Sequence, residues 1–270
     1  WHYHVTGRAI EEVLQTALGE NGRFAGTISS TGSAGTIACG DYLKHNFPES
    51  KIAAAEALQC PTLLMNGFGG HRIEGIGDKH VPWIHNVRNT DFVIAVDDQF
   101  CMNVIRLFNE PAGQEYLSGL GLSSEMIQSL PLLGISSISN LIAAIKFAKY
   151  YELSDRDLVF TIFTDSMELY QSRLAELREE FGEYTRDDAI RDYHRFLMGV
   201  TTDHMLELSY YDRKRIHNLK YFTWIEQQGK ELDELNAQWY EYPDYWTSIQ
   251  NQMSKIDELI REFNEKTGLI

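Results

Sequence analysis

Four short apolar runs, each flanked by charged or turn residues, constrain the fold of this chain more than any other feature. They lie at 24–29, 51–55, 92–96 and 159–163. Runs of this length and composition are typical of strands that are buried on both faces. Helical patterns separate them, at 36–46, 98–108 and 137–150, and a further one follows at 167–181. This alternation predicts an α/β fold, in which helices cover both faces of a mostly parallel sheet.

The last third of the chain differs in composition from the rest. From about Glu176 onward glycine becomes rare, and aromatic and acidic residues dominate. Apolar residues at helical spacing predict a helix over 253–263, which Gly268 would terminate, and a second helix is expected over 231–236. We therefore divide the chain into an α/β domain, residues 1–175, and a helical extension, residues 176–270.

The charge of the chain argues against two classes of partner. Its 270 residues include 39 acidic and 24 basic side chains, for a formal charge of −15. Nucleic acid and anionic membrane surfaces would repel such a chain, and no apolar run approaches the roughly 20 residues that span a bilayer. Three widely spaced cysteines, Cys39, Cys60 and Cys101, predict neither a disulfide framework nor a zinc site. These features favour a cytoplasmic, reducing location.

A segment of small residues follows the first predicted strand and precedes a helix. It consists of Gly32, Ser33, Ala34, Gly35 and Thr36. Small residues let the backbone approach a bound anion, and the N–H groups and dipole of the helix favour negative charge there. The segment has neither the Gly-Lys-Ser/Thr ending of a P-loop nor the G-x-G-x-x-G spacing of dinucleotide sites. It is either a phosphate-binding loop or a tight turn that needs small residues.

Five segments, in order, resemble motifs of one enzyme family. The segment 32–36 resembles the phosphate loop Gly-Thr-Gly-Gly-Thr of the cysteine synthase and cystathionine β-synthase family, which are pyridoxal-phosphate enzymes of fold type II. Residues 5–10 resemble the family's Thr-Thr-Gly-Pro-Glu-Ile, and residues 71–82 resemble its His-Lys-Ile-Gln-Gly-Ile-Gly…Ile-Pro. Residues 134–137 resemble its Gly-Ile-Ser-Ser, and residues 163–170 resemble its Phe-Pro-Asp-Ser-Gly-Glu-Arg-Tyr. Together the five cover about residues 5 to 172.

The resemblance implies a cofactor, pyridoxal 5′-phosphate (PLP), and places residues around it. Residues 32–36 would bind its 5′-phosphate, and Ser136 would place a hydroxyl against the pyridine nitrogen. A neutral hydroxyl does not require a protonated ring nitrogen, which favours β-elimination or β-replacement over transamination. Gly75 and Ile76 would lie beside the substrate. Alternatively, Ser136 caps a helix that begins near Ser137.

The expected function is that of a cysteine synthase-like transferase or lyase that acts on a serine-, cysteine- or O-acetylserine-like amino acid. In the family, the lysine that forms the Schiff base with PLP lies upstream of the phosphate loop, and none of the ten lysines here sits in that context. The resemblance therefore implies that the catalytic lysine belongs to a missing N-terminal half, present in cis or as a separate chain. The alternative is a non-catalytic scaffold or regulatory subunit with the same fold.

Three departures from the family pattern bear on the pocket. Ala34 replaces a glycine and adds only a methyl group, so phosphate binding should survive. Residues 138–140, Ile-Ser-Asn, replace the family's Gly-Ala-Ala, and we expect Ile138 to reshape the pocket. Met167 and Leu169 replace a glycine and an arginine, so that turn is expected to differ.

Several other polar residues are weaker candidates. Arg72 could bind a substrate carboxylate, although most arginines are simply surface residues. Asp165 and Ser166 follow the last strand and are candidates for the rim of the pocket. Pairs of histidines lack a carboxylate or cysteine at fixed spacing, so we expect no metal site at His2, His4, His80 or His85.

The aromatic side chains of the extension, among them Trp224, Trp239 and Trp246, exceed what a thin surface layer could bury. We expect the extension to fold back over the α/β domain and to contribute to a homodimer interface or to the rim of the active site. The alternative is a satellite bundle that stabilises only its own chain.

Overall fold

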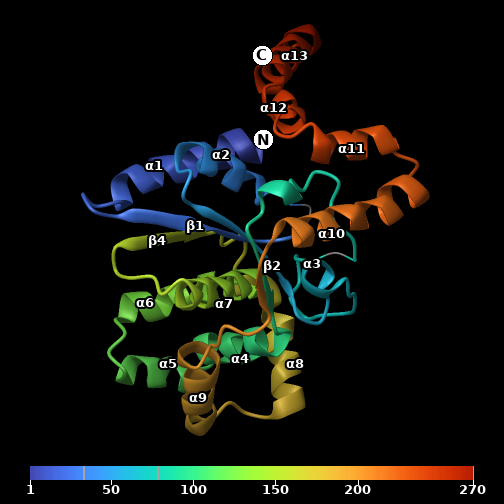
Figure 1. The fold of residues 1–270 in the computed structure, drawn as a ribbon. Coiled ribbons are helices and arrows are strands. Elements are labelled where there is room, and N and C mark those ends of the chain that lie inside the picture. The colour runs from blue at the N-terminus through green and yellow to red at the C-terminus, as the bar shows by residue number, and fades with distance from the viewer. Residues whose placement is uncertain (33, 78, 270) are drawn as a thin grey trace.

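A sheet of five strands forms the centre of the structure (Figure 1). The computed structural model describes residues 1–32, 34–77 and 79–269. Within them the strand order is β4-β1-β2-β3-β5, formed by β1 (Arg23–Ser30), β2 (Lys51–Ala57), β3 (Phe92–Val96), β4 (Asp157–Thr161) and β5 (Met205–Glu207). The first four strands run parallel to one another, and β5 is antiparallel to β3. The prediction of an α/β fold with a mostly parallel sheet is confirmed.

Helices fill the connections between the strands. Up to residue 181 they are α1 (Gly7–Ala17), α2 (Ala38–Asn46), α3 (Thr62–Met65), α4 (Asp98–Asn109), α5 (Pro111–Gly119), α6 (Ser124–Ser129), α7 (Ile135–Tyr150) and α8 (Gln171–Phe181). Beyond it they are α9 (Arg186–Tyr193), α10 (Tyr210–Lys220), α11 (Leu232–Tyr240), α12 (Asp244–Gln250) and α13 (Met253–Thr267). Short 3₁₀ turns and π-helical segments include Met167–Tyr170, His2–Thr6 and Tyr221–Gln227. Each helix expected from the sequence is present, with its ends shifted by a few residues.

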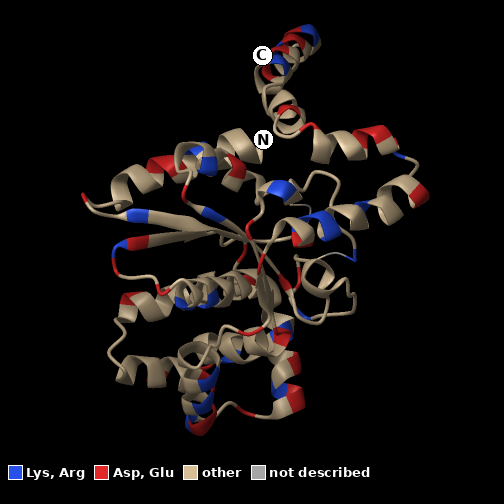
Figure 2. Cartoon of the chain, in the orientation of Figure 1, with Lys and Arg blue, Asp and Glu red and all other residues tan. Residues whose placement is uncertain are grey.

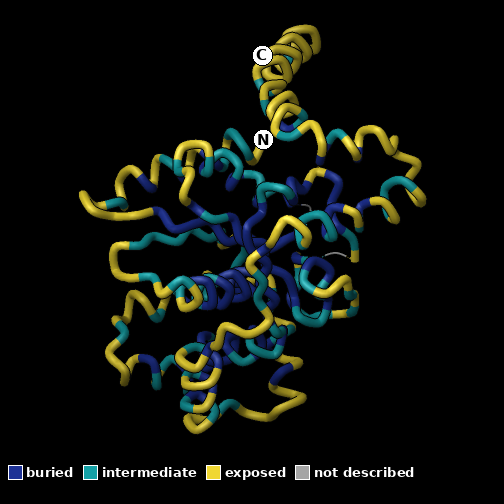
Figure 3. The backbone as a smooth tube through the Cα atoms, viewed as in Figure 1, coloured by how far each residue is buried: buried dark blue, intermediate teal, exposed yellow. Residues whose placement is uncertain are grey.

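The two faces of the sheet are covered by different helices. Helix α7 packs across β1, β3 and β4, with α4 beneath it, whereas α1, α2 and α3 lie on the opposite face (Figure 1). Strands β1, β2 and β3 and helices α4 and α7 are the most buried elements (Figure 3). Small side chains on β2 let both layers approach closely, because Ala53, Ala54 and Ala55 have no exposed surface.

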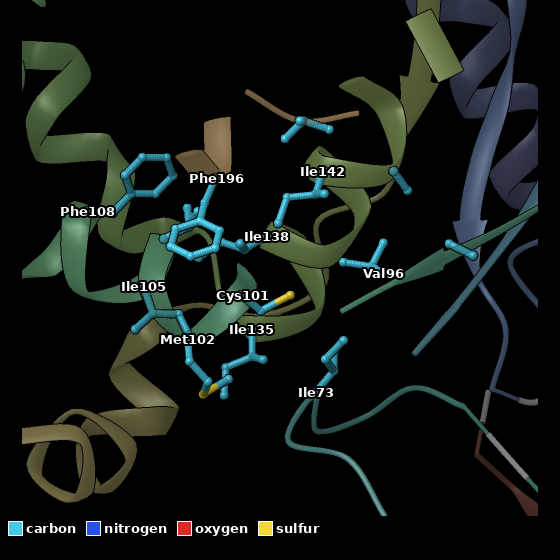
Figure 4. Close-up of a cluster of buried hydrophobic side chains, with 14 of the residues drawn as sticks. Ile73, Val96, Cys101, Met102, Ile105, Phe108, Ile135, Ile138, Ile142 and Phe196 are labelled. Atoms are coloured by element: carbon cyan, nitrogen blue, oxygen red, sulfur yellow. The ribbon is translucent and has the colours of Figure 1, made fainter. Parts of the chain in front are cut away.

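The larger hydrophobic cluster fills the space between the sheet, α4 and α7 (Figure 4). Ile138 is one of its members and is fully buried, beside Cys101, Met102 and Phe196. The expectation that Ile138 reshapes the pocket is therefore wrong. Its position on α7 directs it into the core, and the pocket-facing positions of that helix are occupied by other residues.

The region after residue 175 is not entirely helical, contrary to the prediction. Residue 176 lies inside α8, and β5 pairs with β3 along Phe92, Val93 and Ile94. A strand of three residues is too short to produce a recognisable alternating pattern. Lys146 on α7 holds the chain just before β5, since its Nζ donates to the carbonyl oxygens of Thr201 (3.1 Å) and Asp203 (2.8 Å).

The extension folds back over the α/β part of the chain, as predicted. Arg213 on α10 donates to the carbonyl oxygen of Thr90 (2.7 Å) and to the carboxylate of Asp91 (3.0 Å). Lys220, at the end of the same helix, reaches the segment before β3 and donates to the carbonyl oxygens of Trp83 (2.9 Å) and His85 (2.7 Å). These contacts join α10 to the face of the sheet that α2 and α3 cover.

The last helix, α13, projects away from the rest of the chain (Figure 1) and has no buried residue. Acidic and basic residues are interspersed along outer helices such as α8 and α9 (Figure 2). In the described part of the chain no single helix is long and apolar enough to cross a membrane. Two helical segments, Ser124–Leu132 and Ile135–Tyr150, reach that length and composition only when they are taken together, and the chain bends sharply between them.

Candidate functional site

A cavity of about 160 Å³ opens at the carboxyl ends of β1 and β4. The chain continues from β1 to β2 on one side, whereas β4 is added on the other side of β1. Ligands of α/β proteins bind outside the sheet at such points, where the strand order reverses. The lining includes every described residue that was predicted to touch cofactor or substrate: Gly32, Ala34, Gly35, Thr36, Gly75, Ile76 and Ser136. Ser33, also predicted, lies outside the described residues.

The predicted phosphate loop connects β1 to α2. The backbone N–H groups of residues 38–40 bond to carbonyl oxygens three residues earlier, at 3.0 to 3.2 Å, so the helix begins with a tight turn. The hydroxyl oxygens of Ser29 and Thr36 lie 2.5 Å apart across the cavity wall. Ala34 has a φ of 61°, in the left-handed region that favours glycine. Its methyl group is therefore accommodated at some conformational cost, about 1–2 kcal/mol.

A second glycine-rich segment forms the wall beside this loop. Gly75 and Gly77 have φ values of 81° and 75°, a conformation that few other residues adopt without strain. The N–H of Gly77 donates to the carbonyl oxygen of Thr31 at 2.8 Å, which fixes the segment against the loop. Gly75 and Ile76 thus share the cavity with the loop, and their contact with a substrate stays a prediction.

Ser136 lies in the first turn of α7, but it does not cap the helix. The N-cap residue is Gly134, so the alternative interpretation of Ser136 as a helix cap is wrong. Its hydroxyl oxygen is 3.2 Å from the hydroxyl oxygen of Thr164 and 3.2 Å from Oδ1 of Asp165. Ser136 and Thr164 both line the cavity, whereas Asp165 lies behind Ser136. The rim position expected for Asp165 is therefore wrong.

Asn140 is a residue of this site that the sequence analysis missed. It lines the cavity, is only 4% exposed, and its Oδ1 accepts hydrogen bonds from the backbone N–H (3.0 Å) and the hydroxyl (2.7 Å) of Ser30. Its Nδ2 donates to the carbonyl oxygen of Ile162 at 2.8 Å. Asn140 therefore ties the end of β1 to the segment after β4. A signal was available, because residues four apart on a helix share a face and Asn140 follows Ser136 by four.

Replacing Asn140 by alanine should lower the free energy of unfolding by roughly 2–4 kcal/mol, because it leaves the buried polar groups of Ser30 and Ile162 without partners. Urea unfolding followed by circular dichroism measures the effect. Asn109→Ala is the matched control, since Asn109 bonds only to a carbonyl of its own helix. Equal losses in the two variants would contradict the role of Asn140 as a link between β1 and the segment after β4.

The cavity is suited to an anion. No aspartate or glutamate is among the described residues that line it, although the whole chain carries a charge of −15. Hydroxyl groups line it instead, and the loop residues that precede α2 place the cavity at the end of that helix where the dipole favours negative charge. The lining hydroxyls belong to Ser29, Ser30, Thr36, Ser136 and Thr164, and His2 is the only basic residue among the described lining residues.

Arg72 does not reach the cavity. Its guanidinium donates to Asp98 (2.8 Å) and Gln99 (2.8 Å), and the hydrogen bond that it donates to Asp98 raises the pKa of Arg72. Ser166 precedes the 3₁₀ turn after β4 and is not among the cavity residues. Within the described ranges no group of three His, Cys, Asp or Glu side chains is arranged to hold a metal ion.

Comparisons with known proteins agree with this geometry. No family model matches the chain. Over 146 residues, 54% of this chain, it is 30% identical to a cysteine synthase B of Campylobacter jejuni, of which the match covers 42%. It is 28% identical to a cysteine synthase of Staphylococcus aureus over 54% of this chain and 41% of that protein.

Solved structures give the same result. A hydrogen sulfide-producing enzyme from Fusobacterium nucleatum is 26% identical and superposes with a TM-score of 0.50, over 71% of this chain and 50% of that one. A cysteine synthase from Entamoeba histolytica, 21% identical, has the same fold with a TM-score of 0.53, over 71% of this chain and 49% of that one.

The sheet and the position of the cavity define an α/β domain of the fold type II class. Together with the curated relatives, they support a relationship to the cysteine synthase and cystathionine β-synthase family, whose members use PLP. The chain spans about two fifths of the length of the curated relatives it matches and about half of the solved chains.

Proposed function

We propose that this chain binds PLP and forms one part of an enzyme that carries out β-replacement or β-elimination on a serine-, cysteine- or O-acetylserine-like amino acid. The observation that carries the proposal is that the described residues of the loop, together with Gly75, Ile76 and Ser136, line one cavity that no described acidic residue lines. The similarity to cysteine synthases over 146 residues supports the same class of reaction.

The loop and the start of α2 would hold the 5′-phosphate. Thr36 supplies a hydroxyl, and the N-terminus of α2 supplies the positive end of the helix dipole. Ser136 would face the pyridine ring from the first turn of α7, and the segment at Gly75 and Ile76 would form the wall beside the substrate. PLP, when bound, supplies the electron sink of the reaction, and the protein supplies orientation and electrostatics.

The second candidate is a non-catalytic scaffold or regulatory subunit. It is favoured by one observation: no lysine is among the described residues that line the cavity. In the enzyme hypothesis the lysine comes from a further segment of the polypeptide or from a separate chain. The intact mass of the native polypeptide, measured together with turnover of O-acetylserine and sulfide, separates the two hypotheses. PLP binding without turnover in the native assembly would support the scaffold.

Titration calorimetry of the chain with PLP, with inorganic phosphate as competitor, tests the cofactor site. We expect both to bind at one site, and Thr36→Val to weaken both because it removes a cavity hydroxyl. Thr16→Val is the control, since the hydroxyl of Thr16 bonds only to its own helix on the surface. PLP binding that phosphate does not displace would contradict the assignment of the loop.

The proposed enzyme is a homodimer in solution. Exposed apolar side chains on α13 and at the chain start, among them Phe263 and Trp1, are available for such an interface. Sedimentation equilibrium measures the mass of the assembly.

A further inference from the structure

A second cavity, of about 480 Å³, lies between the start of the chain, α2 and the last helices, and we call it the extension cavity. Residues of the π-helical segment His2–Thr6, of α2, of the segment 83–84 and of α11, α12 and α13 line it. Gly35 and His2 line both this cavity and that of the candidate site, so the two cavities are neighbours. Its volume lies within the range of about 300–1,000 Å³ that is typical of small-molecule sites.

The walls of the extension cavity are largely apolar and rich in aromatic rings. Aliphatic side chains of α12 and α13 line it together with four aromatic side chains, Tyr3, Trp83, Tyr245 and Trp246. Both indole groups are buried and hydrogen-bonded: Nε1 of Trp83 donates to Oε1 of Glu234 (3.3 Å), and Nε1 of Trp246 donates to the carbonyl oxygen of Gln238 (3.1 Å). These rings are thus held in place before a ligand binds, which lowers the entropic cost of binding.

Asp41 contributes a carboxylate to the cavity wall that amide groups stabilise in place of a cation. It accepts hydrogen bonds from the side chains of Asn86 (3.2 Å) and Asn89, but it forms no ion pair with a lysine or arginine of the described ranges. The nearby Lys44 bonds instead to Asp91 (2.7 Å). Burial raises the pKa of Asp41 to about 6, so the group is ionised at pH 8, where a bound cation would stabilise it.

Glu234 contributes a second carboxylate, from α11. Its Oε1 accepts hydrogen bonds from the hydroxyl of Tyr245 (2.7 Å) and from Trp83, whereas none of the described residues donates to its Oε2. No lysine or arginine is among the described residues that line the cavity. The basic side chains there are those of His2 and His4, and imidazole groups are mostly uncharged above pH 7. The side chains of the lining therefore have a negative balance of charge.

Two lysines contact the indole rings without lining the cavity. The Nζ atom of Lys230 is 4.9 Å from the centroid of the Trp83 ring, and that of Lys220 is 5.6 Å from the centroid of the Trp246 ring. Three oxygen acceptors surround the Lys220 nitrogen. Because the faces of aromatic rings attract ammonium groups, the same rings are suited to a cation that enters the cavity.

We propose that the extension cavity binds an organic ammonium ion that carries an apolar body of about the size of one ring. The carboxylates of Asp41 and Glu234 attract the ammonium group, and the aromatic and aliphatic walls cover the apolar body. The same carboxylates repel anions, in contrast to the cavity of the candidate site, which no described acidic residue lines. The proposal does not rest on the assignment of PLP, because neither carboxylate lines that other cavity.

Ligand-observed nuclear magnetic resonance titrations of the native polypeptide with three matched compounds test the proposal. They are made at pH 8 and about 0.15 M salt, which screens non-specific attraction to the acidic chain. Phenethylamine has both the ammonium group and the ring, phenethyl alcohol replaces the ammonium group by a hydroxyl, and ethylamine lacks the ring. We expect phenethylamine to bind about tenfold more tightly than either of the others, because only it uses both the carboxylates and the apolar walls.

Two variants locate the binding in the extension cavity. Glu234→Gln keeps an acceptor for Trp83 and Tyr245 but removes the charge, and Asp41→Asn removes the other charge. Each should weaken phenethylamine binding by about fivefold and leave the binding of phenethyl alcohol unchanged. Asp155→Asn is the matched control, because it removes an exposed carboxylate just before β4, outside the cavity.

Equal affinities for phenethylamine and phenethyl alcohol would overturn the proposal. Absence of phenethylamine binding would also overturn it and would mean that a second copy or another polypeptide segment fills the cavity. An equal loss in Asp155→Asn would show that the overall charge of the chain attracts the amine, again against the proposal. If Asp41→Asn does not fold, judged by circular dichroism, the comparison of Glu234→Gln with Asp155→Asn decides it.

Discussion

Replacing Gly35 by aspartate is expected to abolish binding of inorganic phosphate and of PLP. Gly35 lines the cavity in the loop between β1 and α2, and no acidic residue is among the described residues around it. A carboxylate there would face a bound phosphate at a separation of about 4 Å, where like charges repel by about 4 kcal/mol at an effective dielectric constant near 20. Affinity should therefore fall at least about a hundredfold, which titration calorimetry measures.

A glycine far from the cavity provides the control for this substitution. Gly119 lies at the end of α5, and a side chain there meets no atom within 4 Å. Gly119→Asp adds the same charge to the chain and should leave phosphate affinity unchanged. Unaltered binding in Gly35→Asp, or an equal loss in Gly119→Asp, would show that the loop is only a tight turn.

Replacing Lys220 by methionine is expected to have the largest effect on stability. Lys220 has no exposed surface, and its Nζ donates to the carbonyl oxygens of Trp83 and His85 and to Oε1 of Gln238. Burial lowers the pKa of Lys220, yet three acceptors around one nitrogen match the three donors of an ammonium group. Its removal takes the donor from the carbonyl oxygen of Trp83 and from Oε1 of Gln238, and it leaves the carbonyl oxygen of His85 with only the N–H of Val87 as partner, so unfolding should become easier by about 3–5 kcal/mol. Urea denaturation measures the difference.

Lys230→Met is the matched control for Lys220. Lys230 also belongs to the extension and contacts Trp83, but its Nζ lies over the Trp83 ring, 4.9 Å from the ring centroid. The Lys230 side chain is exposed. We expect a change within about 0.5 kcal/mol, as for most surface substitutions. If the two lysine variants lose the same stability, the three buried hydrogen bonds do not hold the extension to the segment before β3.

Short-range patterns explain why most of the fold was predictable. The strand at 92–96 was predicted with its observed bounds, because both faces of β3 are buried and every residue is apolar. The strand predicted at 159–163 instead spans Asp157–Thr161, since Asp157 pairs with Arg23 on the neighbouring strand. That pairing is a tertiary contact between residues far apart in sequence, so no local pattern could reveal it.

The residues of the candidate site were likewise predictable only in part. The loop, Ser136 and the Gly75 segment were found through motifs, and the structure brings them to one cavity. The inward direction of Ile138 and the bridging role of Asn140 depend on how α7 rotates against β1 and β4, which a list of motifs does not contain. The contact between Ser136 and Asp165 likewise joins α7 to the segment after β4, two parts of the chain that no single motif contains.

The pairing of β5 with β3 determines what can be removed from this protein. Without β5, the outer side of β3 would present unpaired N–H and C=O groups along a strand whose side chains are all apolar, a combination that promotes edge-to-edge aggregation. Deleting everything after Ala175 would therefore expose β3 as an aggregation-prone edge strand as well as remove the extension. Any dissection of the extension should keep the chain through Glu207, so that aggregation is not mistaken for the loss of a functional surface.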